Sequence, residues 1–279
     1  MVIAIGLVEM RDGYSTRGRR QLGIGIMDGV IRDHCKELER CNQRGGRMLS
    51  VFDLLKAGTL DLDLAGYLMA RISRGASFMV GANPGGAGKT TVMCALLNFV
   101  PGEVVLTAAT ETTVQKFLQR GCVAPTCLIC HEIGAGPYFG YLWGKDLREY
   151  CALGEQGCML ATNLHADDLD EARSQICVEN GVPEKHFAAF QLLAFLRVEG
   201  GWSSSRRYID KVYTSGDGSP HRLVYERTKG FQAVDDTLDT AYYEACRRFL
   251  GQHADGSIRT IEQTRRLVAD FFAADGGTP

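Results

Sequence analysis

The sequence predicts an α/β fold: a mainly parallel sheet with flanking helices, preceded by a small N-terminal segment and followed by a C-terminal β-hairpin plus helices. Short apolar runs alternate with helix-period segments from residue 77 to residue 178. A glycine-rich turn separates the first apolar run from the helical segment after it. Beyond residue 190 the pattern becomes that of antiparallel strands.

Each expected element follows from its local pattern. Before the sheet, we expect helices over 28–39, 51–55 and 62–72 and a flexible link over 40–47. The alternating region predicts strands over 77–80, 103–107, 126–133 and 158–162 and helices over 89–98, 111–119, 144–153 and 167–178. The tail predicts strands over 192–198, 207–214 and 222–225, a turn over 215–220, and helices over 237–249 and 257–272. We expect three parts, over 1–50, 51–232 and 233–279.

Composition narrows the class of protein. The chain has 279 residues, 45% of them hydrophobic, a formal charge of −2 and a pI near 6.3. The chain has no excess of Lys and Arg over Asp and Glu, which argues against nucleic acid as a direct partner. No apolar run reaches the length of a membrane span, and residues 1–10 lack a basic leader, so we expect a cytoplasmic protein. Ten cysteines then indicate reduced thiols rather than a disulfide framework.

The run from Cys127 to His131 has the CxxCH spacing of c-type haem attachment. However, it lies in an expected buried strand, and haem attachment requires export. A zinc site of Cys122, Cys127, Cys130 and His131 is a second alternative, but alternate strand residues point to opposite faces of a sheet. Small buried cysteines account for the run better.

The most informative stretch is the glycine-rich turn over 80–91, VGANPGGAGKTT. Glycines let the backbone fold tightly and point its N–H groups at a triphosphate, Lys89 can reach the β- and γ-phosphates, and Thr90 can give a hydroxyl to Mg²⁺. Asn83 replaces the first glycine of GxxxxGK[ST], and Asn tolerates a left-handed backbone well. The pattern predicts binding of ATP and Mg²⁺ by Asn83, Pro84, Gly85, Gly86, Ala87, Gly88, Lys89, Thr90 and Thr91. The alternative is a turn with an incidental Lys-Thr pair.

Two carboxylates and a histidine follow this turn in the order that a nucleotide-hydrolysing core needs. Glu132 comes near the end of an apolar strand and can ligate Mg²⁺ or activate water, and the alternative is a strand cap. His165 follows the next strand and can sense a γ-phosphate, and the alternative is a satisfied loop histidine. Glu111 is a second candidate base or a solvated helix start. Asp167 and Asp168 indicate a helix N-terminus.

At these residues the chain resembles the type II/type IV secretion ATPases, motors of secretion systems and of pilus or Tad-type assembly. Glu132 is similar to the glutamate after the family's Walker B strand, and residues 161–166, ATNLHA, are similar to its His box. The segments 97–107, 195–198 and 206–209 are also similar, so the resemblance covers about 53–231. It implies a P-loop NTPase (RecA-like) core that hydrolyses ATP with Mg²⁺ in a hexameric homo-oligomer. It also implies that the partner is an inner-membrane platform protein. The chain would then be cytoplasmic or, as the alternative, attached peripherally at the inner membrane.

Departures from the family favour a reduced catalytic apparatus. The acidic Asp box is replaced by residues 108–111, AATE, which leaves Glu111 alone. The segment before the Walker B strand is short and keeps Arg120 as its arginine, and Ile133-Gly134 stands where the family has Arg-Asp or Arg-Gly. The sequence therefore predicts an ATP-hydrolysing motor subunit. The alternatives are a nucleotide-binding regulator without turnover and an unrelated phosphoryl-transfer enzyme.

Two groups of side chains keep several interpretations open. Arg17, Arg19 and Arg20 can act on a neighbouring subunit's triphosphate or form a solvated loop. Four aromatic residues also have several interpretations: Tyr138, Phe139, Tyr141 and Trp143. Core packing is the default interpretation, and the alternatives are a partner-docking patch and a loop beside the nucleotide.

Overall fold

The computed structural model describes residues 16–42, 45–83, 85–200, 205–216, 219–233 and 235–274, with the backbone alone over 16–27. In these ranges nine strands form one sheet, with the order β2-β3-β5-β1-β6-β7-β8-β9 and with β4 paired to β3. The first five strands of this order are parallel, and β6 to β9 continue antiparallel. The strands are β1 (Phe78–Gly81), β2 (Val105–Ala108), β3 (Thr126–Ile133), β4 (Tyr141–Leu142), β5 (Met159–Leu164), β6 (Leu192–Glu199), β7 (Arg206–Thr214), β8 (Arg222–Glu226) and β9 (Gly230–Phe231).

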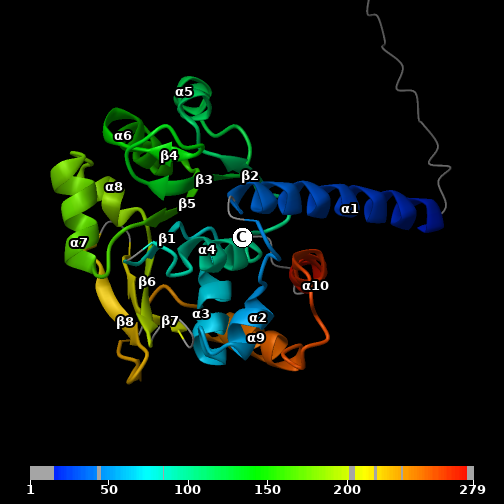
Figure 1. Cartoon of the computed structure of the whole chain (residues 1–279). Helices are drawn as coiled ribbons and strands as arrows, with labels where there is room; N and C mark the ends of the chain where they lie inside the picture. The colour runs from blue at the N-terminus through cyan, green and yellow to red at the C-terminus, as the bar shows by residue number, and fades with distance from the viewer. Residues whose placement is uncertain are drawn as a thin grey trace, which may run out of the picture.

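Helices cover both faces of this sheet (Figure 1). They are α1 (Thr16–Cys41), α2 (Val51–Lys56), α3 (Leu62–Ile72), α4 (Lys89–Leu97), α5 (Glu111–Arg120), α6 (Gly144–Ala152), α7 (Leu169–Arg173), α8 (Glu184–Ala188), α9 (Thr240–Gln252) and α10 (Ile261–Ala274). The helix α1 projects sideways from the rest of the molecule, and its C-terminal end lies beside the sheet (Figure 1). The expected mainly parallel α/β fold is therefore confirmed.

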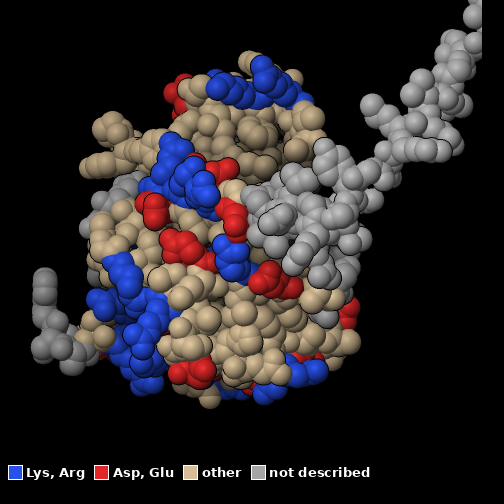
Figure 2. Space-filling view, turned by 90° about the vertical axis from the view of Figure 1, so that its right-hand side faces the viewer, with Lys and Arg blue, Asp and Glu red and all other residues tan. Residues whose placement is uncertain are grey.

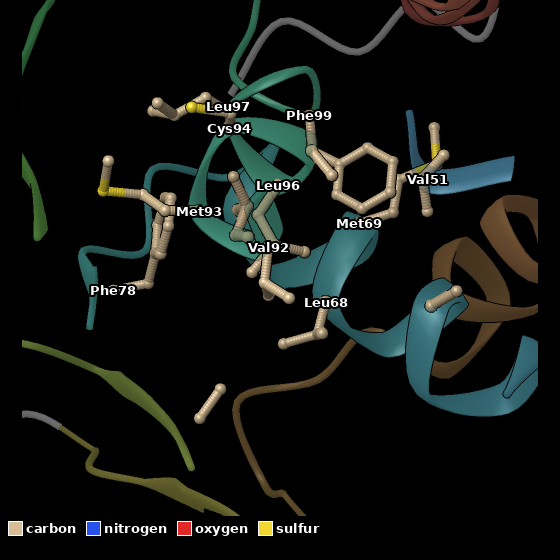
Figure 3. Packing of buried hydrophobic residues seen from close by; sticks show 14 of the residues in the cluster. Val51, Leu68, Met69, Phe78, Val92, Met93, Cys94, Leu96, Leu97 and Phe99 are labelled. Atoms are coloured by element: carbon tan, nitrogen blue, oxygen red, sulfur yellow. The ribbon is translucent and has the colours of Figure 1, made fainter. Parts of the chain in front are cut away.

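Alternate residues of the buried strands enter two separate hydrophobic clusters. In β1, Phe78 and Val80 belong to the cluster under α1 to α4, α9 and α10, whereas Met79 belongs to the cluster under α5 to α8. Every residue of β1 and β3 is buried, as is typical of parallel strands covered on both faces. Figure 3 shows the first cluster where the side chains of α3 and α4 meet.

The expected strands and helices are present, with ends shifted by a few residues. The first helix is longer than predicted, because it begins at Thr16. The helix expected over 167–178 is α7 followed by a π-helical turn over Ser174–Glu179. The elements β4, α8 and β9 were not predicted, because they are too short to carry a periodic pattern. Residues 43–44 of the expected link and 217–218 of the expected turn lie outside the described residues.

Capping side chains mark where several helices begin. Ser50 and Asp53 form a reciprocal capping box at α2, and the carboxylates of Asp61 and Asp168 accept N–H bonds at the starts of α3 and α7. The start of α4 differs, because its N-cap is Gly88 and makes no side-chain hydrogen bond. Its first N–H groups are thus oriented to receive an acceptor from outside the helix.

One disulfide joins Cys122, which precedes β3, to Cys158, which precedes β5, with Cα atoms 5.8 Å apart. The expectation of reduced thiols is wrong for these two residues, because β3 and β5 are neighbours in the sheet and their starts lie close together. The bond also removes Cys122 from the alternative zinc site. Across the described ranges, no group of three or more His, Cys, Asp and Glu side chains could by itself hold a metal ion.

The three predicted parts of the chain share one hydrophobic cluster. Ile31 of α1, Leu96 of α4 and Phe272 of α10 all belong to it. The boundaries at 50 and 232 stay a prediction, since shared packing does not define where a domain begins.

Gly66 lets α3 and α9 approach closely, and this contact gives the first testable prediction. A Cβ atom on Gly66 would lie 2.9 Å from Cα of Arg247 in α9, which is backbone and cannot move aside. Gly66→Ala should therefore lower the free energy of unfolding by about 1–2 kcal/mol, although alanine is intrinsically better than glycine in a helix. Gly29→Ala in α1, where a Cβ meets no atom within 4 Å, should raise it by about 0.5–1 kcal/mol. Urea unfolding of both variants checks the sign of each change, and a stabilised Gly66→Ala chain would contradict the close packing.

Candidate functional site

The carboxyl ends of three neighbouring strands meet at one edge of the sheet. β1, β5 and β3 lie side by side and parallel, and they end at Gly81, Leu164 and Ile133. Open α/β sheets bind their ligands at this edge. A cavity of about 280 Å³ lies there, lined by the turn after β1, the start of α4, the ends of β3 and β5, and residues of the link 41–49.

The turn after β1 has the tight backbone that its glycines predict. Gly86 and Gly88 have φ angles of 91° and 101°, in the left-handed region that favours glycine. Residues 85–88 line the cavity. Asn83 is exposed and has no positive φ, so a left-handed backbone is not what places asparagine there. Pro84 lies outside the described residues.

The start of α4 offers several groups suited to an anion. The helix begins without a side-chain cap, so its N–H groups and the positive end of its dipole face the cavity edge. Lys89, Thr90 and Thr91 are its first residues, and all three line the cavity. A second cation lies near, since Cδ of Arg207 in β7 is 3.6 Å from the position of a Cβ atom on Gly88.

Three of the predicted site residues, Lys89, Glu132 and His165, come together from three elements. Lys89 Nζ lies 3.6 Å from Glu132 Oε1 and 3.2 Å from His165 Nδ1, and it donates to the carbonyl of Ala82 at 3.3 Å. His165 Nε2 lies 3.9 Å from Glu132 Oε1. Lys89 and Glu132 are only 5% and 7% exposed, so solvent screens their attraction weakly. The structure brings these residues into one cluster, and their catalytic roles stay a prediction.

The charge of this cluster resides on Lys89 and Glu132. Partial burial, and then the nearby Lys89 ammonium, lower the pKa of His165 below its usual value. The imidazole is therefore neutral at pH 7. It can exchange hydrogen bonds with a bound group without adding a second positive charge.

A shift in the pairing register of β3 lies at the adjacent residues His131 and Glu132, both of which reach the cavity. Strict alternation would send them to opposite faces of the sheet, yet both line the cavity. The register of β3 against β5 shifts between Cys130 and Ile133, and such a shift re-aims side chains. Asn163 of β5 secures the shifted segment by donating to the carbonyl of His131 at 2.8 Å.

Glu111, the other candidate base, does not line the cavity. It is exposed at the start of α5, after the edge strand β2, which β3 and β5 separate from β1. Arg120 is exposed at the other end of that helix. The side chains of Arg17, Arg19 and Arg20 lie outside the described residues. Of the two candidate bases, Glu132 is the one beside Lys89.

The aromatic residues after β3 divide between surface and site. Tyr138 and Phe139 are 61% and 44% exposed, so core packing is wrong for both. Phe139 packs edge-on against His131, with ring centroids 5.2 Å apart. Tyr141 lines the cavity, and Trp143 packs against the cluster under α5 to α8.

The groups that hold the start of the turn were not predicted from the sequence. The N–H of Asn83 donates to Asp167 at 2.7 Å, and the N–H of Asp167 donates to Glu171 at 2.8 Å. The loop after β5 thus fixes the loop after β1. Asp167 and Asp168 look alike in sequence, but Asp168 caps α7 as expected. The position of Arg207 near the turn could not be predicted from the sequence, because it depends on the order of strands in the sheet.

Comparisons with known proteins leave the family open. No protein-family model matches the chain, and no curated protein matches it. Among solved structures, the chain is similar to the VirB11 ATPase of the Brucella suis type IV secretion system, solved in complex with sulphate. The two share 14% identity and a TM-score of 0.41, over 74% of this chain and 64% of that one. The match thus spans less than two thirds of the VirB11 chain. A likeness of this size defines neither a family nor an activity for this chain.

Proposed function

We propose that this chain is a P-loop NTPase that binds ATP with Mg²⁺ and hydrolyses it to ADP and phosphate. The observation that carries the proposal is the cluster of Lys89, Glu132 and His165 beside the glycine-rich turn. A buried cation at a helix N-terminus and a buried carboxylate next to it are the groups that phosphoryl transfer to water requires.

The residues of the cavity fit a magnesium triphosphate. The N–H groups at the start of α4 and the Lys89 ammonium would donate to phosphate oxygens. The Thr90 hydroxyl and the Glu132 carboxylate are oxygen ligands of the kind that Mg²⁺ takes, with water and phosphate oxygens completing the set. The bound ion would neutralise charge on the phosphates. Met48 and Leu49 also line the cavity and offer apolar surface to the rest of the nucleotide.

Glu132 would orient the attacking water and accept its proton. Its carboxylate is held by Lys89, and it lines the cavity where the register of β3 shifts. His165 would register the presence of the γ-phosphate, because it contacts both Lys89 and Glu132. A change in the position of its neutral ring would shift the loop after β5. The same loop also holds Asn83 through Asp167.

We extend the proposal to a motor subunit of a secretion or pilus assembly system that works as a homo-oligomeric ring. The resemblance of residues 161–166 to the His box of that family supports it. A ring supplies each site with a cation from its neighbour, and closed symmetry is the usual outcome of such contacts. An inner-membrane platform protein is the partner implied by the same resemblance.

The cell compartment and nucleic-acid binding belong to the proposal as well. Across the described ranges, no helix has the length and apolar character to cross a bilayer. On the face in Figure 2, basic side chains form separate clusters with acidic side chains between them. We propose a cytoplasmic protein, attached peripherally at the inner membrane through its partner, without direct contact to nucleic acid.

A nucleotide-binding regulator without turnover is the second candidate. The position of Glu111 favours it, because the last carboxylate of the Asp-box segment lies outside the cavity. Such a chain would bind MgATP through the same turn and release no phosphate.

Steady-state phosphate release separates the two candidates. We expect the native chain to hydrolyse MgATP with a rate per chain that rises with protein concentration, because a ring completes its sites only after assembly. Light scattering on the same samples reports the oligomer. Tight MgATP binding without phosphate release at any concentration would support the regulator instead.

A further inference from the structure

A buried cluster of two thiols and an imidazole lies in the wall of the cavity, and the proposed hydrolysis does not use it. Cys41 is the last residue of α1, Cys94 lies in α4, and His131 lies in β3. All three side chains are buried, and Cys41 and His131 line the cavity. Three separate elements thus bring together groups that are far apart in sequence.

The contacts in this cluster place a thiol against an imidazole. Cys41 Sγ lies 3.4 Å from His131 Nε2 and donates to the carbonyl of Glu37 at 3.4 Å, and the Cys94 side chain lies near enough to act on the Cys41 sulfur. Cys94 Sγ is also 3.9 Å from the carbonyl of Leu38, on the last turns of α1. A thiol within hydrogen-bonding reach of an imidazole, with that imidazole oriented by a third group, is the arrangement that activates a sulfur nucleophile.

The loop after β3 fixes the orientation of the His131 ring. Gly140 has a φ of 72°, and a Cβ atom there would lie 2.8 Å from Cγ of His131. The N–H of His131 donates to the carbonyl of Gly140 at 2.8 Å, and the Phe139 ring covers the imidazole edge-on. The backbone and an aromatic ring therefore position the imidazole against Cys41.

Cys41 differs from other free cysteines in its surroundings. The nearby Cys94 side chain, together with the His131 imidazole, lowers the pKa of Cys41 below its usual value in spite of its burial. Burial instead raises the pKa of Cys35 to about 11 and that of Cys177 to about 12. The cavity also gives a molecule as small as a peroxide access to Cys41, although the side chain is only 2% exposed.

We propose that Cys41 is a peroxide-reactive thiol, positioned by His131 and resolved by Cys94 into a disulfide that ties the end of α1 to the helix of the glycine-rich turn. In the first step the Cys41 sulfur attacks one oxygen of hydrogen peroxide, the O–O bond breaks, and the products are a sulfenic acid and hydroxide. In the second step the Cys94 sulfur attacks the Cys41 sulfur, the S–O bond breaks, and water leaves with the Cys94 proton. The two thiols are oxidised and the peroxide is reduced to two molecules of water.

The structural consequence is a covalent link across the cavity wall. Cys94 lies in the same short helix as Lys89, and Cys41 ends α1 and lines the cavity. The bond would fix the end of α1 to α4 beside the cavity, and reduction would release it.

Peroxide treatment of the native full-length chain, followed by thiol blocking, digestion and mass spectrometry, tests this inference without any nucleotide. We expect a linked peptide pair containing Cys41 and Cys94 that is two hydrogen atoms lighter than the separate peptides. In Cys94→Ser the sulfenic acid at Cys41 should accumulate and react with a cyclic diketone probe, and Cys41→Ser should give neither product. Cys177→Ser, a change at a more exposed thiol outside the cluster, should form the link as the native chain does.

The rate of Cys41 oxidation shows whether His131 positions the thiol for reaction or only packs against it. His131→Asn should slow oxidation of Cys41 by about tenfold while circular dichroism shows an unchanged fold. Oxidation of Cys41 no faster than that of Cys177 in the native chain would overturn the inference, as would pairing of Cys94 with a different cysteine. Because the readout is the mass of the peptides, a chain without ATPase activity gives the same test.

Discussion

Glu132→Gln is expected to reduce phosphate release by about 100-fold to 1000-fold while leaving MgATP binding largely intact. Glutamine has the same shape, but its amide cannot accept a proton from water at neutral pH. Glu132 is 7% exposed and its carboxylate lies 3.6 Å from Lys89 Nζ. Because the site is buried, bulk water cannot take over the role of the lost negative charge. The prediction is checked by phosphate release at saturating MgATP, alongside equilibrium binding of the same nucleotide.

Glu111→Gln is the matched control for this substitution. Glu111 is exposed outside the cavity, so the same chemical change there should alter phosphate release by less than about twofold. Native turnover in Glu132→Gln, combined with lost turnover in Glu111→Gln, would assign the base to Glu111 and contradict the site described here.

Arg265→Ala is expected to lower the free energy of unfolding by about 3–4 kcal/mol. Arg265 is fully buried in α10, and Nη1 donates to the carbonyls of Asn98 and Val100, which follow the C-terminal end of α4. Burial lowers its pKa to about 10, which still leaves the guanidinium charged at pH 7. The positive charge also complements the negative end of the α4 dipole. Alanine would remove the charge, leave both carbonyls without this donor and open a cavity.

Its neighbour Arg266 provides the control, because it carries the same charge at the surface. Arg266 pairs with Asp28 at 2.7 Å and its side chain is 54% exposed. Arg266→Ala should therefore change stability by no more than about 1 kcal/mol. Urea unfolding measures both variants, and equal effects at the two positions would contradict a structural role for the buried guanidinium.

The sequence predicted that Lys89, Glu132 and His165 lie close together, and the structure brings these three residues into one cluster. Lys89 follows a recognisable turn, and Glu132 and His165 come at or just after the ends of buried strands. Because parallel strands present their carboxyl ends at one edge of a sheet, residues at those ends lie close together. Glu111 was misplaced by the same reasoning, since it also follows a strand, but β2 lies at the edge of the sheet.

Contacts that depend on sheet order and register could not be predicted. The register shift in β3 depends on its pairing with β5, and the Asn163 side chain that bonds to this segment gives no local signal. The Cys122–Cys158 disulfide likewise depends on which strands are neighbours, since 36 residues separate the two cysteines. Arg207 comes near the glycine-rich turn from β7 and Cys41 lines the cavity from the end of α1, and neither approach has a local sequence signal.

Equilibrium binding of MgATP, measured by titration calorimetry on the native chain and on Lys89→Ala, tests the central claim most directly. We expect the native chain to bind and Lys89→Ala to bind at least about 100-fold more weakly, because the alanine lacks the cation at the phosphates. Lys145→Ala, which removes an exposed lysine from α6, should bind as the native chain does. Thermal unfolding of each variant confirms that the fold is retained. Absence of binding by the native chain, or equal binding by Lys89→Ala, would contradict the assignment of this cavity to a nucleoside triphosphate.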